Sequence, residues 1–190
     1  MPRNRLILIL LFVLGTGCAA GAAEDAVVMT EQGQVVGTVA PTLRKFLGIP
    51  YAAPPVGDLR WTPPKAHAPW DRPFDATQFR NHCPQVASVF GVASVSEDCL
   101  FLNIFTPNDE TTEENGPHGS PVMVWIHGGA LTVGESDDYI PTKLVQQGHV
   151  IVVTMNYRLG ALGFLAHPAL SAESPDHISV TTASWTSSSR

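Results

Sequence analysis

Two uncharged runs of β-branched and aromatic residues in the second half of the chain have the length of strands. Residues 122–126 read Val-Met-Val-Trp-Ile, and residues 150–155 read Val-Ile-Val-Val-Thr-Met. Continuous apolar runs of this length are typical of strands buried on both faces of a parallel sheet. A helix is predicted between them, from about Tyr139 to Gln147 and ended by Gly148. Strand, helix and strand in this order indicate a right-handed parallel crossover.

The first half of the chain follows a different pattern. Residues 27–39 alternate apolar and polar positions around Glu31-Gln32-Gly33, which predicts an antiparallel hairpin. Residues 102–107 alternate like a strand and end at a proline. Between these segments, proline and glycine are dense from residue 46 to residue 74, so a helix is excluded and an extended surface segment is expected there.

Two consecutive glycines follow the 122–126 run after a single histidine. Gly128 and Gly129 let the backbone turn sharply and point its N–H groups outward, a geometry that a Cβ would obstruct. Such N–H groups can stabilise an oxyanion. The alternative is a glycine turn that only leads the chain out of a core strand.

Composition and charge narrow the classes of function. Of the 190 residues, 44% are hydrophobic and 15% are charged, which describes one globular, loop-rich domain. The net charge of −6 without a basic stripe argues against nucleic acid or an anionic membrane surface as a partner. None of the seven histidines has the His-X-His or His-X₃-His spacing of a metal site, so no metal is expected. Six are interpreted as surface or loop residues: His67, His82, His118, His149, His167 and His177.

The first 23 residues have the layout of a secretory signal peptide. Two arginines precede an apolar run at residues 6–14, and small residues follow up to the expected cleavage after Ala22 or Ala23. The run is too short to span a bilayer as a helix, so a secreted or lumenal protein without further membrane contact is expected. An uncleaved anchor and a lipid-modified Cys18 remain the alternatives.

Two cysteines lie outside the signal segment. In an oxidising compartment, Cys83 and Cys99 most simply form a disulfide. Two reduced core cysteines are the alternative if the signal interpretation is wrong.

Four blocks taken together resemble the type-B carboxylesterase and cholinesterase family of α/β-hydrolases. In the family's order and spacing they are Phe46 to Trp61, Glu97 to Pro107, Val124 to Ala130 and Asn156 to Leu165. The likeness extends from about Val27 to Ser179 and matches only the N-terminal part of the family's catalytic domain. It implies an α/β fold with a mixed, mostly parallel central sheet, truncated before the nucleophile elbow.

The resemblance assigns the glycine turn a role in catalysis. Gly128, Gly129 and Ala130 match the family's oxyanion loop, with the Gly129 and Ala130 N–H groups as the expected donors. His127 matches a residue that shapes this loop and is not the catalytic base. Leu131 replaces the usual aromatic residue, so the shape of the acyl pocket is left open.

The resemblance also assigns two structural pairs. Cys83 and Cys99 match the family's first disulfide. Arg60 and Glu97 match a buried ion pair that holds the proline-rich segment onto the sheet, a structural rather than catalytic role.

The family's chemistry is acyl transfer by a serine, a histidine and an acid, without a metal or cofactor. Its serine lies in Gly-X-Ser-X-Gly, which does not occur in this chain, so no catalytic residue is assigned. Ser120 precedes a strand, and Ser171 and Ser174 are interpreted as loop residues without flanking glycines. The resemblance therefore implies a serine hydrolase of small carboxylic esters in the parent protein and an inactive chain by itself. A non-catalytic adhesion protein of the same fold is the alternative.

The last eleven residues depart from the family. Where the family continues Gly-Asn-Tyr-Gly-Leu-Leu-Asp-Gln-Gln, residues 180–190 are rich in serine and threonine. Codons for this tail, read from one base earlier, permit the family's residues, so we expect an out-of-frame reading. The domain organisation is thus a signal peptide at 1–23, part of a carboxylesterase domain at 24–179 and an aberrant tail at 180–190. In such a chain the strand edge beside residues 150–155 is expected to be exposed.

Overall fold

The computed structural model describes residues 25–108, 119–174, 177 and 179. The elements are β1 (Asp25–Thr30), β2 (Gly33–Ala40), β3 (Leu43–Pro50), the 3₁₀ turn η1 (Gly57–Leu59), β4 (Phe74–Asp75), β5 (Phe101–Pro107), β6 (Val122–Ile126), α1 (Thr142–Gly148), β7 (Ile151–Met155), α2 (Gly160–Phe164) and α3 (Pro168–Glu173). Within these ranges, no helix is both long and apolar enough to cross a bilayer. The predicted signal peptide and aberrant tail fall on residues outside the described ranges and remain predictions.

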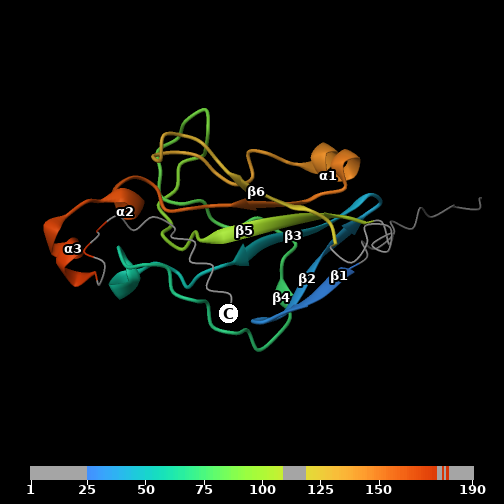
Figure 1. Cartoon of the computed structure of the whole chain (residues 1–190), viewed down its shortest axis with the longest axis horizontal. Helices are drawn as coiled ribbons and strands as arrows, with labels where there is room; N and C mark the ends of the chain where they lie inside the picture. Colours follow the sequence, from blue (N-terminus) through green and yellow to red (C-terminus); the bar gives the residue numbers. More distant parts are fainter. Residues whose placement is uncertain (1–24, 109–118, 175–176, 178, 180–190) are drawn as a thin grey trace, which may run out of the picture.

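The strands form one mixed sheet in the order β1-β2-β3-β5-β7-β6, and β4 pairs with β2 (Figure 1). A mixed sheet is what the resemblance implies. In this part of it the parallel pairings, β2 with β4 and β6 with β7, are nevertheless outnumbered by the antiparallel ones. The cause is local, because β1, β2 and β3 are joined by connections too short for a parallel crossover.

The predicted hairpin is confirmed, with β1 and β2 antiparallel from the Asp25–Thr38 pair to the Thr30–Gly33 pair. The proline-rich segment begins as a strand, since Leu43–Pro50 forms β3 between β2 and β5. After β3 the chain is extended apart from η1. A long helix is absent from this segment, as the proline and glycine content predicts.

The predicted strand–helix–strand unit is present, and β6 and β7 are parallel from Val122–Ile151 to Ile126–Met155. Helix α1 begins at Thr142, later than predicted, and Pro141 occupies the position before its first residue. It ends at Gly148 as predicted. Its Val145 is fully buried in a cluster with residues of β3, β5 and β7.

The prediction that both apolar runs are buried strands is correct for β7 and wrong for β6. Every residue of β6 is exposed, from 40% for Trp125 to 62% for Val122. Among the described strands β6 pairs only with β7, whereas β7 lies between β5 and β6. The exposed edge of the sheet is therefore at β6 and not beside residues 150–155, because the crossover places the earlier strand outside the later one.

Candidate functional site

The loop at residues 127–134 leaves the carboxyl end of β6 and turns back on itself. The N–H groups of Thr132 and Val133 both donate to the Gly129 carbonyl oxygen at 3.1 Å. Gly129 has φ +105°, and a Cβ added there would overlap the carbonyl of Val133. Only glycine fits this position without moving the backbone. An added Cβ at Gly128 would meet no atom within 4 Å, so the two glycines are not equivalent.

The loop presents two backbone donors. Within the described residues, the N–H groups of Gly129 and Ala130 donate no hydrogen bond. Ala130 is exposed and Gly129 is half-buried. Adjacent N–H groups of this kind can hold a negatively charged oxygen in the way an oxyanion hole requires.

The backbone of the loop is strained. Ala130 and Leu131 have φ +54° and +62°, in the left-handed region that disfavours residues with a Cβ. Each such residue costs on the order of 1 to 3 kcal/mol and persists only where its surroundings fix the backbone. The Leu131 carbonyl accepts a hydrogen bond from the Gly160 N–H at 2.7 Å, which anchors the loop to α2. The Leu131 side chain is 49% exposed and adds little packing.

His127 supports the start of the loop. Its ring stacks on Tyr157, with centroids 4.3 Å apart, and the Tyr157 hydroxyl donates to the His127 carbonyl at 2.9 Å. Nδ1 lies 2.8 Å from the Gly128 carbonyl oxygen, which can only accept, so the proton is assigned to Nδ1. Burial lowers the pKa of His127 and keeps the ring neutral. These contacts fit a residue that shapes the loop.

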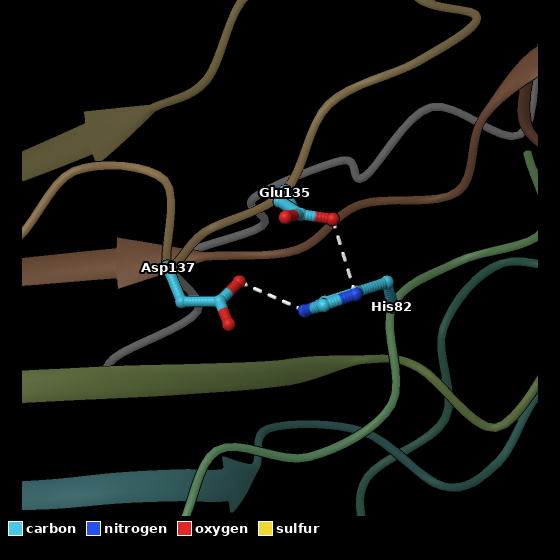
Figure 2. Close-up of side chains that lie close together, drawn as sticks. All are labelled: His82, Glu135 and Asp137. Atoms are coloured by element: carbon cyan, nitrogen blue, oxygen red, sulfur yellow. Dashed lines mark ion pairs between the residues drawn. The ribbon is translucent and has the colours of Figure 1, made fainter. Parts of the chain in front are cut away.

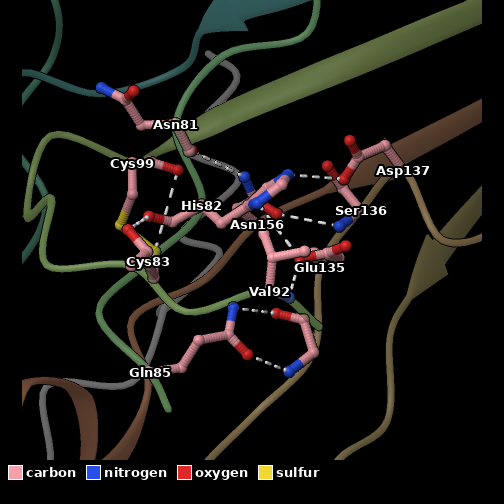
Figure 3. Close-up of polar contacts among 12 residues, drawn as sticks. Asn81, His82, Cys83, Gln85, Val92, Cys99, Glu135, Ser136, Asp137 and Asn156 are labelled. Atoms are coloured by element: carbon pink, nitrogen blue, oxygen red, sulfur yellow. Dashed lines mark hydrogen bonds and ion pairs between the residues drawn. A yellow bond between two sulfur atoms is a disulfide. The ribbon is translucent and has the colours of Figure 1, made fainter. Parts of the chain in front are cut away.

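The end of the loop is held by the segment that follows Cys83. The Gln85 side chain makes two hydrogen bonds with the backbone of Gly134: its Oε1 accepts from the N–H at 2.7 Å and its Nε2 donates to the carbonyl at 3.0 Å (Figure 3). The Val92 N–H donates to Glu135 Oε2 at 2.9 Å. Chain segments far apart in sequence thus fix the backbone on which the strained turn depends.

A buried polar network ties the next residue to the sheet. The Ser136 N–H donates to Asn156 Oδ1 at 2.9 Å, and Asn103 Nδ2 donates to Ser136 Oγ at 3.0 Å and to Thr154 Oγ1 at 3.1 Å. Asn103 also accepts from the Gly48 N–H at 2.9 Å. The sequence interpretation did not identify this network. Its signal was the presence of the polar residues Asn103 and Thr154 within the two strands.

His82 was interpreted as a surface or loop residue; it does lie in a loop outside the helices and strands, but its side chain is not on the surface. Its side chain is only 17% exposed, with Nδ1 3.1 Å from Glu135 Oε2 and Nε2 2.8 Å from Asp137 Oδ1 (Figure 2). The hydrogen bond with Asp137 raises the pKa of His82 against the effect of burial, and the charges of Asp137, Glu135 and Asp138 raise it further. Burial raises the pKa of Glu135. Ligand atoms of His82, Glu135 and Asp137 lie within 4.8 Å of one another, so this group of residues could hold a metal ion. The spacing of histidines along the sequence gave no sign of the group.

Cys83 and Cys99 are joined by a disulfide, and both are buried. They pack in one cluster with Leu100, Leu159 and Tyr157. Tyr157 is the ring that stacks on His127, so the disulfide core directly supports the start of the loop.

Arg60 and Glu97 form a two-bond ion pair, with Nε 2.6 Å from Oε2 and a second contact between Nη2 and Oε1. The pair is not buried, because the Arg60 and Glu97 side chains are 41% and 20% exposed. The buried arginine is Arg158, which donates from Nη1 to the Thr62 carbonyl at 2.9 Å. Arg158 therefore also fastens the proline-rich segment, a contribution that the sequence interpretation did not include.

The serines considered as nucleophiles lie elsewhere in the fold. Ser171 is within α3 rather than in a loop, and Ser174 follows the last residue of that helix. Ser120 precedes β6, at the opposite end of that strand from the loop. Ser136 is close to the loop, but it is buried and its Oγ accepts a hydrogen bond from Asn103.

Comparison with known proteins gives consistent matches. Residues 24–175 match the model of the Carboxylesterase family. The chain is 44% identical over 177 residues to fumonisin B1 esterase of Sphingopyxis macrogoltabida, covering 88% of this chain and 32% of that protein. It is 39% identical over 172 residues to acetylcholinesterase of Electrophorus electricus, covering 81% and 26%. A solved structure of PNB esterase superposes with a TM-score of 0.71 at 39% identity, covering 80% of this chain and 32% of that chain. The chain thus spans about a third or less of the length of these relatives.

Proposed function

We propose, from the premise that the chain belongs to the carboxylesterase family and has part of its α/β-hydrolase fold, that it supplies the oxyanion loop of a serine ester hydrolase. The observation that carries the proposal is the pair of unused donors at Gly129 and Ala130. Gly128 completes the loop and lets it leave β6.

Acyl transfer passes through a tetrahedral intermediate whose oxygen carries a negative charge. Donors fixed in advance stabilise this charge without reorganising during the reaction, and losing one such donor typically lowers kcat about 100- to 1,000-fold. The supports of the loop therefore have a chemical purpose, because they keep two N–H groups in position on a strained backbone. Metals and cofactors have no part in this proposal.

The nucleophile, base and acid are not assigned in this chain. No Gly-X-Ser-X-Gly occurs in its sequence, and Ser136 is buried within a hydrogen-bond network. We therefore expect the 190-residue chain by itself to be inactive and the triad to be encoded elsewhere in the same gene.

The proposed substrate is a small carboxylic ester. The relatives' names include a fumonisin B1 esterase and acetylcholinesterases, which supports an ester as the substrate. The disulfide supports secretion or residence in the secretory lumen, since disulfides persist in oxidising compartments. A purely adhesive protein would have no need of unused donors, so the loop favours the enzyme.

Two proteins test the proposal side by side. The 190-residue chain should hydrolyse a short-chain p-nitrophenyl ester no faster than buffer. The protein encoded by the complete transcript, read across the codon for Ser179, should hydrolyse it and react with a fluorophosphonate probe for active serines. A complete protein that is folded but neither hydrolyses the ester nor reacts with the probe would instead support the adhesion alternative.

A further inference from the structure

We propose that His82 is an imidazolium held between Glu135 and Asp137, and that this charged clamp positions the oxyanion loop. The effect of the clamp on catalysis rests on the proposed function. The protonation state of His82 and its effect on the backbone are independent of the proposed function.

The geometry of the clamp favours two protons on the ring. Nδ1 and Nε2 face oxygens of two different carboxylates, at 3.1 Å and 2.8 Å (Figure 2). A carboxylate only accepts hydrogen bonds, and a neutral imidazole donates only one. If His82 were neutral, one ring nitrogen would turn its lone pair toward a carboxylate oxygen, so both contacts together select the cation.

A metal ion is the competing occupant of this group of residues. Zinc lies about 2.0 to 2.2 Å from a histidine nitrogen and from a carboxylate oxygen. A tetrahedral zinc ion bound to both atoms would hold them about 3.4 Å apart, which is wider than the 2.8 Å between His82 Nε2 and Asp137 Oδ1. Distances of 2.8 and 3.1 Å are those of close ion pairs between an imidazolium and two carboxylates.

The clamp joins the two segments that hold the end of the loop. His82 precedes Cys83, whose disulfide fixes its backbone, and Glu135 directly follows Gly134 (Figure 3). Gln85 and Val92 bond to the same stretch from the same side. Gln85 and Val92 contribute neutral groups to this contact, and Glu135 and Asp137 contribute carboxylates. His82 supplies its positive charge.

The surrounding charges set the direction of the pH effect. The carboxylates that face His82 are Asp137, Glu135 and Asp138, and all three raise its pKa, whereas the nearby His127 is neutral through burial. A histidine pKa raised above its usual 6.5 means that the clamp is complete below pH 6.5 and is lost as the pH rises through the raised value. Above that value, the buried Glu135 and the half-buried Asp137 are two carboxylates without their shared cation. The backbone at Gly134 then loses part of its support.

The test uses the 190-residue chain in dilute solution and needs no enzymatic activity. Histidine C2 hydrogen exchange, followed by mass spectrometry against pH, should give His82 a pKa above the 6.5 that is usual for histidine. Amide exchange should show protection at Gly134 and Val92 that falls about tenfold or more as His82 loses its proton, the range expected for a charge-assisted hydrogen bond.

Variants separate the clamp from general stability. His82→Gln should remove the pH step in amide protection, and Asp137→Asn, which keeps the shape of the side chain, should lower the pKa of His82. His67→Gln should leave both measurements unchanged. Circular dichroism confirms that each variant is folded. If His82→Gln does not fold, Asp137→Asn and the pKa of the wild-type histidine still decide the proposal.

Three results would overturn the clamp. They are a His82 pKa at or below 6.5, a pH step that persists in His82→Gln, and stoichiometric zinc binding that displaces protons and depends on His82. Because none of these measurements involves an ester, a failed clamp would leave the proposed function standing, and an inactive complete protein would leave the clamp standing.

Discussion

Gly129 decides the shape of the candidate site because an added Cβ would overlap the carbonyl of Val133. The same turn also places Ala130 and Leu131 in the left-handed region. The loop therefore has no spare conformational freedom, and its geometry depends on contacts made by Tyr157 and Gln85.

At this scale, Gly129→Ala should lower the free energy of unfolding by about 2 kcal/mol or more, since the substitution adds steric overlap to a residue with positive φ. Gly148→Ala is the matched control, because its added Cβ would make only ordinary contacts of 3.7 Å or longer at the end of α1. Urea unfolding followed by circular dichroism measures both. Equal stability of the two variants would show that the turn accommodates a Cβ at Gly129.

Sequence reasoning identified Gly129 but interpreted His82 only as a surface or loop residue, and the difference is physical. A pair of glycines shortly after an apolar strand can be recognised from the local sequence alone. The surroundings of His82 are created by folding, since Glu135 and Asp137 reach it from a distant part of the chain. Similarly, the Arg60–Glu97 pairing followed from the resemblance, but its exposure depends on what covers the proline-rich segment.

The elements support the site through the disulfide loop. The disulfide between Cys83 and Cys99 closes a loop whose ends lie next to Tyr157 and whose interior contains Gln85 and Val92. Tyr157 supports the start of the oxyanion loop through His127. Gln85 and Val92 support its end at Gly134 and Glu135.

Replacing both cysteines by serine should lower the free energy of unfolding by about 3 kcal/mol, mainly by releasing the unfolded chain. It should also reduce amide protection at Gly134, because Gln85 loses its fixed position. Val89→Ser is the control in the same loop, since Val89 is 91% exposed. Unchanged protection at Gly134 in the cysteine-free chain would separate the disulfide from the oxyanion loop.

Elements with local patterns were predicted more accurately than their surroundings. The β1–β2 hairpin and the strands β5 and β7 followed from alternation or apolar runs. The start of α1 was predicted too early, before Pro141. The burial of β6 was predicted wrongly, because burial depends on neighbouring elements and not on the strand's own sequence.

At the scale of the whole molecule, one edge of the sheet is both apolar and uncovered within the described residues. The side chains of β6 are exposed, and the apolar surface continues through Tyr139, Ile140 and Leu144. Trp125 and Tyr139 pack ring to ring, 4.9 Å apart, on this surface. An exposed apolar strand edge is a template for pairing with another chain.

The 190-residue chain should therefore self-associate, with a second copy pairing along β6. Val124→Lys places a charge at the centre of this strand and should shift the chain toward the monomer. Val95→Lys adds the same charge at a residue that is 95% exposed outside any strand, and it should not. Sedimentation velocity over a range of concentrations measures the difference; a monomeric wild-type chain at every concentration would contradict the prediction.

The central claim is that the loop at Gly128, Gly129 and Ala130 stabilises an oxyanion, and it is tested most directly by steady-state kinetics of the protein from the complete transcript. With a short-chain p-nitrophenyl ester, Gly129→Ala should lower kcat about 100-fold or more, with a smaller change in KM, because the donors act on the transition state. The Gly148→Ala control should keep its kcat within about twofold. A folded Gly129→Ala enzyme with the kcat of wild type would contradict the account.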